Sequence, residues 1–275
     1  IHFTDRKQLI KPEHDWEFYG CEDPRVTKID DRYYIFYTAL STYPFSASGI
    51  KVGLAITRDF QTIDEKHLVT PFNAKAMSLF PEKVNGKIAG ILTADTDQPP
   101  AKIGMAYFDK IEEMWDPAYW KNWYSYIQDH TLHLTRSDQD HVEIGAPPVK
   151  TAQGWLLIYS YIKQYFTEHK LFAIEAVILK EKNPLMILSR TTDALLSPEE
   201  PYEKDGLVSN IVFPSGALSQ DDTLSVYYGG ADTVSCLATC SLSALSREMV
   251  PEKPSETVNF NQEIGPIMFR RFEEN

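Results

Sequence analysis

Two acids and a base stand together in the stretch GCEDPRV, residues 20–26, directly before an aromatic and β-branched run. A carboxyl group can act as an acid only while it is protonated, and a neighbouring carboxylate favours that state, whereas a neighbouring Arg opposes it. Glu22, Asp23 and Arg25 could therefore take part in acid–base chemistry. Taken alone, they are better explained by a salt-bridged turn. Charged side chains at the start of a strand are nevertheless typical of a surface that faces a ligand.

A lone carboxyl group, Glu175, interrupts the apolar run LFAIEAVIL at residues 171–179. The run is typical of a buried strand. A carboxylate on such a strand is costly unless it is paired or faces a wet cavity. Glu175 is therefore either a second candidate for chemistry or a residue at a strand edge that faces solvent.

Four segments of the chain resemble one another, and each contains a Pro, a short strand, a turn and a strongly apolar strand. They are EDPRVTKIDDRYYIFYTA (22–39), FPEKVNGKIAGILTAD (80–95), GAPPVKTAQGWLLIYSY (145–161) and FPSGALSQDDTLSVYYGGAD (213–232). Their turns are Asp-Asp, Asn-Gly, Gln-Gly and Asp-Asp, and Asn-Gly is a strong signal for a two-residue hairpin. A third strand is predicted after each hairpin, at 51–60, 102–111, 170–179 and 235–244.

Small antiparallel units that recur at a regular spacing are typical of the blades of a β-propeller. The chain is therefore predicted to be all-β, a single five-bladed β-propeller domain over residues 1–275. Residues 1–20 are expected to supply an incomplete first blade, and the segment near Ile264–Phe269 the closing strand. One helical insertion is expected at 114–127. The chain opens with Ile rather than Met, so we expect that a segment upstream has been removed or is not included.

The innermost strands of a propeller surround its axis, so residues at their starts should converge on one face. Besides the first acidic stretch, the repeats place there Lys75, Phe80, Lys83, Glu143, Asn210 and Phe213.

Composition excludes several classes of partner. The formal net charge is -12 and no basic run is present, which argues against nucleic acid and anionic membranes. No apolar run approaches the roughly 20 residues that a membrane span needs. Three cysteines without CxxC spacing form neither a disulfide framework nor a zinc site; they indicate a reducing compartment, hence a cytoplasmic location. The spacing of His130, His133 and His141 does not indicate a metal site, and no cofactor is expected.

The four ordered motifs resemble glycoside hydrolase family 130, and the resemblance runs from about residue 15 to residue 240. It implies a five-bladed β-propeller that acts on β-mannosides, in most members as an inverting phosphorylase and in some as a hydrolase. Members usually carry an additional N-terminal stretch that contributes to the first blade and the site, and we expect that stretch to be absent here.

The resemblance also implies roles for individual residues. Asp23 is similar to the general acid of the family, which protonates the leaving oxygen through a hydroxyl of the mannose. Asp232 is similar to a residue that holds sugar hydroxyls. The further candidates for positioning the sugar are Glu22, Arg25, Lys75 and Asn210, with Phe213 and Tyr228 as apolar walls or as core residues.

The chain departs from the phosphorylases where they bind phosphate. They typically carry a Lys where this sequence has Glu143, and a His where it has Ser160. Two unit charges about 4 Å apart interact by about 4 kcal/mol at an effective dielectric of 20, so Glu143 would repel phosphate. An inverting hydrolase instead needs a carboxylate base about 6.5–9.5 Å from the acid. Glu143, with help from Glu175, is predicted to be that base.

The sequence therefore predicts inverting hydrolysis of a β-1,2-type mannoside, with a mannose-containing oligosaccharide as substrate. One alternative is a β-mannoside phosphorylase that uses inorganic phosphate. Another is a non-catalytic carbohydrate-binding propeller. Both a monomer and a homo-oligomer are compatible with the sequence.

Overall fold

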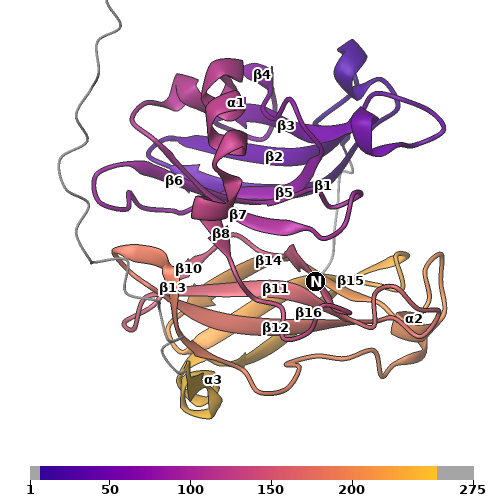
Figure 1. Ribbon diagram of the computed structural model, residues 1–275, viewed down its shortest axis with the longest axis vertical. Coiled ribbons are helices and arrows are strands. Elements are labelled where there is room, and N and C mark those ends of the chain that lie inside the picture. Colours follow the sequence, from indigo (N-terminus) through magenta and orange to yellow (C-terminus); the bar gives the residue numbers. More distant parts are fainter. Residues whose placement is uncertain (1–6, 253–275) are drawn as a thin grey trace, which may run out of the picture.

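The computed structural model describes residues 7–252, which fold into four antiparallel sheets that follow one another along the chain (Figure 1). The first sheet contains β1 (Gly20–Ile29), β2 (Arg32–Leu40), β3 (Ile50–Thr57) and β4 (Glu65–Leu68). The second contains β5 (Ala74–Leu79), β6 (Ile88–Ala94), β7 (Lys102–Phe108) and β8 (Thr131–Leu132). The third contains β9 (His141–Ile144), β10 (Val149–Lys150), β11 (Trp155–Lys163), β12 (Leu171–Lys180), β13 (Asn183–Arg190) and β17 (Val250–Pro251). The fourth contains β14 (Val212–Gln220), β15 (Thr223–Gly230) and β16 (Val234–Ser241).

Short helices occupy the connections between strands. The 3-10 helices are η1 (Asp15–Glu17), η2 (Ala47–Gly49), η3 (Ile111–Trp115) and η4 (Ile127–His130). The α-helices are α1 (Pro117–Ser125), α2 (Pro201–Lys204) and α3 (Leu242–Glu248).

The hairpins expected from the repeats are confirmed. The Asn-Gly turn has positive φ at both Asn85 (51°) and Gly86 (82°), as a two-residue turn of type I′ requires. The four predicted third strands correspond to β3, β7, β12 and β16. The helical insertion predicted at 114–127 is also confirmed, by η3, α1 and η4.

The four sheets are arranged around an axis as the blades of a propeller. In Figure 1, the indigo and purple strands of the first two sheets form the upper half, and the salmon and orange strands of the last two form the lower half. Three clusters of buried apolar side chains fill the interfaces between consecutive sheets. Strand β14 contacts β1, so the fourth sheet also meets the first. The starts of β1, β5, β9 and β14 are thereby brought towards one axis.

The prediction of five blades is wrong for the part of the chain that the structure describes, which contains four. Residues 7–19 form no strand. Leu9, Ile10 and Trp16 pack instead on Ile35 and Tyr37, on the outer face of the first sheet. Pro12 and the helix-forming stretch DWE interrupt the alternation that a strand needs. The closing strand predicted near Ile264–Phe269 lies outside the described residues.

One buried contact recurs in three of the four sheets. A Tyr on the second long strand donates its hydroxyl hydrogen to a buried carboxylate. The three pairs are Tyr37 with Glu17, Tyr159 with Glu175 (3.0 Å), and Tyr228 with Glu203 (2.7 Å). Burial raises the pKa of Glu203, but the amides of Glu199 and Glu200 and the Tyr228 hydroxyl outweigh it and hold that pKa below its ordinary value. Glu17 lies in η1 and Glu203 in α2, so two of these contacts attach a connecting segment to a sheet, whereas Glu175 lies on β12 beside its Tyr.

Replacing Tyr228 with Phe should lower the free energy of unfolding by about 1–3 kcal/mol, because the buried Glu203 loses a hydrogen bond. Urea unfolding measures the effect. The matched control is Tyr227→Phe on the adjacent residue, whose side chain is exposed; it should change stability by less than about 0.5 kcal/mol. Equal effects of the two substitutions would contradict the importance of the Tyr228–Glu203 contact.

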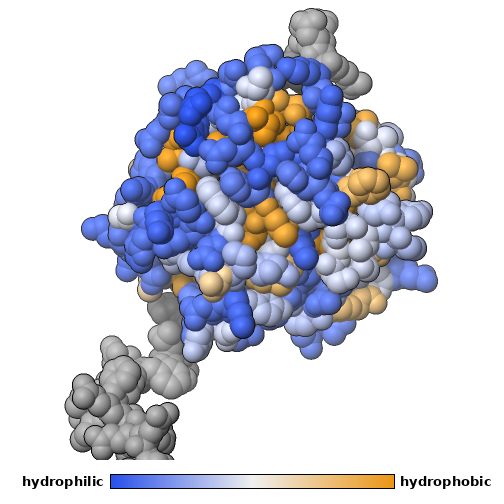
Figure 2. Space-filling view, turned by 90° about the horizontal axis from the view of Figure 1, so that it is seen from above, coloured by the Kyte–Doolittle hydropathy of each residue, from blue (hydrophilic) through white to orange (hydrophobic). Residues whose placement is uncertain are grey.

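The surface is mostly hydrophilic on the side seen in Figure 2, with small apolar patches between the charged side chains. Scattered apolar residues of this kind are ordinary on protein surfaces. Within residues 7–252, no helix is long and apolar enough to cross a membrane.

Candidate active site

Four residues occupy the same position on the innermost strands of the four sheets. Each pairs with a residue near the end of the second long strand of its own sheet. The pairs are Glu22 with Thr38, Lys75 with Thr93, Glu143 with Ser160, and Phe213 with Gly229. Because the sheets surround one axis, the register places two carboxylates, one ammonium group and one aromatic ring around that axis.

Asp23 follows the first of these positions in a β-bulge. The register between β1 and β2 shifts between Glu22 and Arg25, and Asp23 has φ 51°. Bulges are frequent beside active sites because they redirect a side chain, and Asp tolerates the left-handed conformation better than most residues. The side chain is exposed, and within residues 7–252 its carboxylate forms no hydrogen bond or ion pair. Asp23 is thus free to contact a ligand at this end of the axis.

Arg25 connects three sheets at the base of this arrangement. Its Nε donates to the carbonyl of Gly145 (2.7 Å), and its two Nη atoms donate to the carbonyls of Asp23 (2.7 Å) and Ile144 (3.3 Å). The guanidinium lies over the ring of Phe213, 5.9 Å from its centroid. Burial lowers the pKa of Arg25, whereas the negative charges of Asp23 and Glu143 oppose this shift. Arg25 is only 2% exposed, so it holds strand ends together and has little surface open to a sugar, in contrast to its predicted role.

Lys75 lies among several carboxylates. Its Nζ is 3.0 Å from Asp97. Burial opposes the charge of Lys75, but the carboxylates of Asp97, Glu143 and Asp23 outweigh it and raise the pKa of the ammonium group. This ammonium group therefore stays positively charged at neutral pH and partly offsets the negative charges around the axis.

The charges of neighbouring residues also act on Glu22. Burial and the negative charges of Asp23 and Asp232 raise the pKa of Glu22, and Lys75 opposes the shift. Asp232 lies in the turn after β15, exposed and with φ 54°. Glu22 is thus close enough to Asp23, Asp232 and Lys75 for their charges to act on it. The sequence analysis did not identify Asp97, which lies three residues after the end of β6.

Glu143 is half-buried on β9. Its Oε1 lies 3.5 Å from Nε2 of His141. The charge of Glu143 acts on Arg25, on Lys75 and on Tyr165, whose pKa is raised by burial first and by Glu143 second. Asp23 and Glu143 are thus both close to the same two cations. Their roles as acid and base remain predictions.

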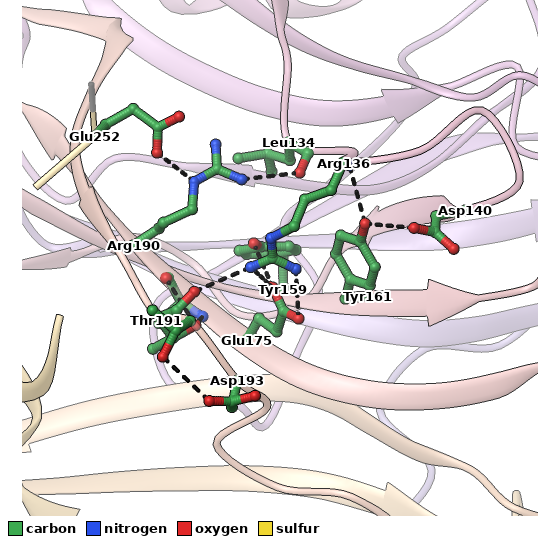
Figure 3. Close-up of polar contacts among 12 residues, drawn as sticks. Leu134, Arg136, Asp140, Tyr159, Tyr161, Glu175, Arg190, Thr191, Asp193 and Glu252 are labelled. Carbon is green, nitrogen blue, oxygen red and sulfur yellow. Dashed lines mark hydrogen bonds and ion pairs between the residues drawn. The ribbon is translucent and has the colours of Figure 1, made fainter. Parts of the chain in front are cut away.

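Glu175 lies in a different environment from the one predicted. Register pairs Glu143 with Ser160 and Glu175 with Tyr159, so the two glutamates point to opposite faces of the third sheet. Both Glu175 oxygens accept hydrogen bonds from Arg136, at 2.8 and 2.7 Å (Figure 3). The buried carboxylate is therefore part of an ion pair and does not assist Glu143.

Three other residues were predicted to bind the sugar, and each lies in a different environment. Tyr228 is buried in the cluster between the third and fourth sheets, so it is a core residue and not an apolar wall of the site. Asn210 is exposed, with φ 59°, and its backbone bonds to Lys204 and Phe172. Phe213 is half-buried beneath Arg25, where it can still form an apolar wall.

A cavity of about 650 Å³ continues along the innermost strands from the residue after Asp23. All four sheets or the loops between their strands contribute to its wall; its lining includes Pro24, Val26, Pro81, Pro147, Ser215 and Tyr227. The lining also carries the charged residues Lys28, Glu82 and Lys150, and it includes none of Glu22, Asp23, Lys75, Glu143 and Asp232. The cavity is therefore separate from the carboxylate cluster, which is the candidate site.

Neither a metal site nor a reactive thiol is found among residues 7–252. No group of three or more His, Cys, Asp or Glu side chains there could hold a metal ion. Burial and the nearby Glu17 raise the pKa of Cys21 to about 12, which keeps the thiol protonated and unreactive. Cys21, Cys236 and Cys240 are all free.

The fold and the site define a β-propeller with a carboxylate-rich rim on its axis. A family model described as beta-1,4-mannooligosaccharide phosphorylase matches residues 1–248. The chain belongs to this family, glycoside hydrolase family 130, as its motifs predicted.

Similar proteins include several phosphorylases. The chain is 33% identical, over 228 residues, to a 1,2-beta-oligomannan phosphorylase of Thermoanaerobacter sp. (strain X514), covering 83% of this chain and 70% of that protein. It is 31% identical to a beta-1,2-mannobiose phosphorylase of Listeria innocua, covering 88% of this chain and 63% of that protein. A solved structure of the beta-1,2-mannobiose phosphorylase from Listeria innocua, in complex with beta-1,2-mannobiose, matches with a TM-score of 0.75 and 29% identity, over 90% of this chain and 65% of that one. The chain thus spans about two thirds of the length of these relatives.

Proposed function

We propose that this chain cleaves β-1,2-linked mannosides and transfers the mannosyl group to inorganic phosphate. The observation that carries the proposal is the convergence of Asp23, Glu22, Lys75 and Asp232 at one end of the propeller axis, in a chain whose relatives are named as β-mannoside phosphorylases. The predicted hydrolysis is therefore the second candidate, and phosphorolysis is the first.

The geometry supports a division of roles around the axis. Asp23, redirected by its bulge and free of protein partners among the described residues, supplies the proton to the leaving oxygen, through a mannose hydroxyl as in the family. Phosphate then attacks the anomeric carbon from the opposite face, the glycosidic bond breaks, and mannose 1-phosphate forms with inverted configuration. Glu22 and Asp232 can accept hydrogen bonds from sugar hydroxyls, and Lys75 supplies positive charge on the acceptor side.

Hydrolysis is favoured by one observation, the position of Glu143. Its half-buried carboxylate lies close to the cations that phosphate would need, and Lys75 is already paired with Asp97. A dianion beside Glu143 would be repelled, whereas water beside it would be activated by a base. The same site can therefore be tested for both acceptors.

Incubation with β-1,2-mannobiose, with and without inorganic phosphate, tests the proposal by product analysis. We expect mannose 1-phosphate and mannose, formed only when phosphate is present. Release of free mannose without phosphate would contradict phosphorolysis and support hydrolysis with Glu143 as base. Turnover of β-1,4-mannobiose alone would overturn the assigned linkage. No product from either substrate would favour a non-catalytic carbohydrate-binding propeller.

A further inference from the structure

Glu143 is flanked by two buried polar atoms that have no partner. The described residues contain four buried side-chain atoms without a hydrogen bond, and two of them are Nε2 of His141 and Oγ of Ser160. Ser160 pairs with Glu143 across the sheet, and His141 lies two residues before it on β9. All three side chains therefore point to the same face of the third sheet. Unpaired buried polar atoms are rare in folded proteins, so two beside one carboxylate indicate a site built for a purpose other than stability.

The imidazole of His141 is fixed in place. The side chain is 2% exposed, and its ring stacks on Tyr165 with centroids 4.1 Å apart and planes 13° from parallel. From this position Nε2 lies 3.5 Å from Oε1 of Glu143 without forming a hydrogen bond. That separation is just beyond a good hydrogen bond, so a small rotation of Glu143 would complete the contact.

The alternative partner of Glu143 is a cation on another sheet. Lys75 lies close enough for the charge of Glu143 to help raise its pKa, but its Nζ contacts Asp97 at 3.0 Å. Without a group on its own sheet, the Glu143 carboxylate could turn towards that ammonium group. His141 is placed to prevent this.

We propose that His141 is a positioning residue that holds the carboxylate of Glu143 at the acceptor side of the site. This inference rests on the proposed function, because it assumes that the mannosyl acceptor binds next to Glu143 through an O–H group, which both water and hydrogen phosphate carry. After the small rotation of Glu143, Nε2 donates to Oε1, Tyr165 fixes the ring, and Oε2 remains available to the acceptor. Ser160 provides a second polar atom for the same acceptor or for a sugar hydroxyl.

Kinetics of single and double variants test the proposal. We expect His141→Leu to lower kcat on β-1,2-mannobiose by about tenfold to a hundredfold, because misplacing a reacting group by about 1 Å costs that much. KM for the mannoside should change by less than about threefold, since ground-state binding is kept. His141→Gln keeps a donor near the position of Nε2 and should recover most of the activity. The control His133→Gln, on an exposed residue after β8, should match the wild type.

A double variant separates this role from general damage. If His141 acts through Glu143, adding His141→Leu to Glu143→Gln should change kcat by less than about twofold, because the two residues act as one unit. Equal losses in both backgrounds, or no recovery with Gln, would overturn the proposal. Thermal unfolding of each variant shows whether the fold is kept.

Crystal structures give a readout that does not depend on turnover. In the His141→Leu variant we expect the Glu143 carboxylate to turn towards Lys75, and in the His141→Gln variant to stay in place. An unmoved Glu143 in the Leu variant would overturn the inference even if the enzyme is active. If the wild-type chain acts on no mannoside, the proposed function fails while this structural comparison still decides the role of His141. If Glu143→Gln leaves no measurable turnover, the double variant cannot be analysed kinetically, and the crystal structures of the two His141 variants decide the role of His141.

Discussion

Replacing Asp23 with Asn is expected to lower kcat on β-1,2-mannobiose by about a hundredfold to ten-thousandfold, which is the range that general acid–base catalysis contributes. The amide has no carboxyl proton to give to the leaving oxygen. Asn adopts the left-handed conformation as readily as Asp, so the bulge with φ 51° at this position should be kept. Steady-state kinetics with phosphate present measure the loss, and thermal unfolding checks the fold.

The matched control is Asp30→Asn. Asp30 is an exposed Asp on the same hairpin, with φ 54°, but it lies in the turn after β1, far along the strand from the site. This substitution should leave kcat unchanged. If Asp23→Asn kept activity within about threefold of the wild type, Asp23 would not be the acid. A chain that binds the mannoside but does not turn it over, with or without Asp23, would be better described as a binding propeller.

Replacing Arg136 with Leu is expected to have the largest effect on stability, a loss of about 3–5 kcal/mol in the free energy of unfolding. The Glu175 side chain is 1% exposed, and Arg136 supplies two hydrogen bonds to its carboxylate and a third to the carbonyl of Thr191. Without Arg136, the buried carboxylate keeps only the Tyr159 hydroxyl. Urea unfolding monitored by Trp fluorescence measures the change.

Two controls isolate the buried charge. Adding Glu175→Gln to Arg136→Leu should restore at least half of the lost stability, because the charge is removed while an oxygen still accepts from Tyr159. Lys87→Met breaks an exposed ion pair with Asp109 and should cost less than about 1 kcal/mol. If Arg136→Leu were as mild as Lys87→Met, the ion pair would not be the stabilising contact inferred here.

Local features of the chain could be predicted because their causes are local. Asn85 and Gly86 adopt positive φ in the turn that their types favour. Alternation and turn residues located β3, β7, β12 and β16. The number of blades was missed, because the stretch before β1 carries no pattern that shows on which surface it packs.

The site was only partly predictable for a related reason. The carboxylates of Glu22, Asp23 and Glu143 were predicted to converge because they stand beside repeated strand ends, and a repeated strand must face the same axis each time. Asp232 was predicted from the resemblance to the family alone. The environment of Glu175 was not found. The sequence showed that a carboxylate in an apolar strand needs a partner or a wet cavity, but not which of the two it has.

The amino-acid sequence by itself determined the all-β class, the hairpins, the repeated units and the family. Only the tertiary structure decided which carboxylates share a surface. Register places Glu143 and Glu175 on opposite faces of one sheet, and the partner of Glu175 lies 39 residues away in the chain. Asp97 pairs with Lys75, and His141 lies close to Glu143, for the same kind of reason. Strand pairing and sheet packing bring such groups together, and neither can be predicted from the spacing of neighbouring residues in the sequence.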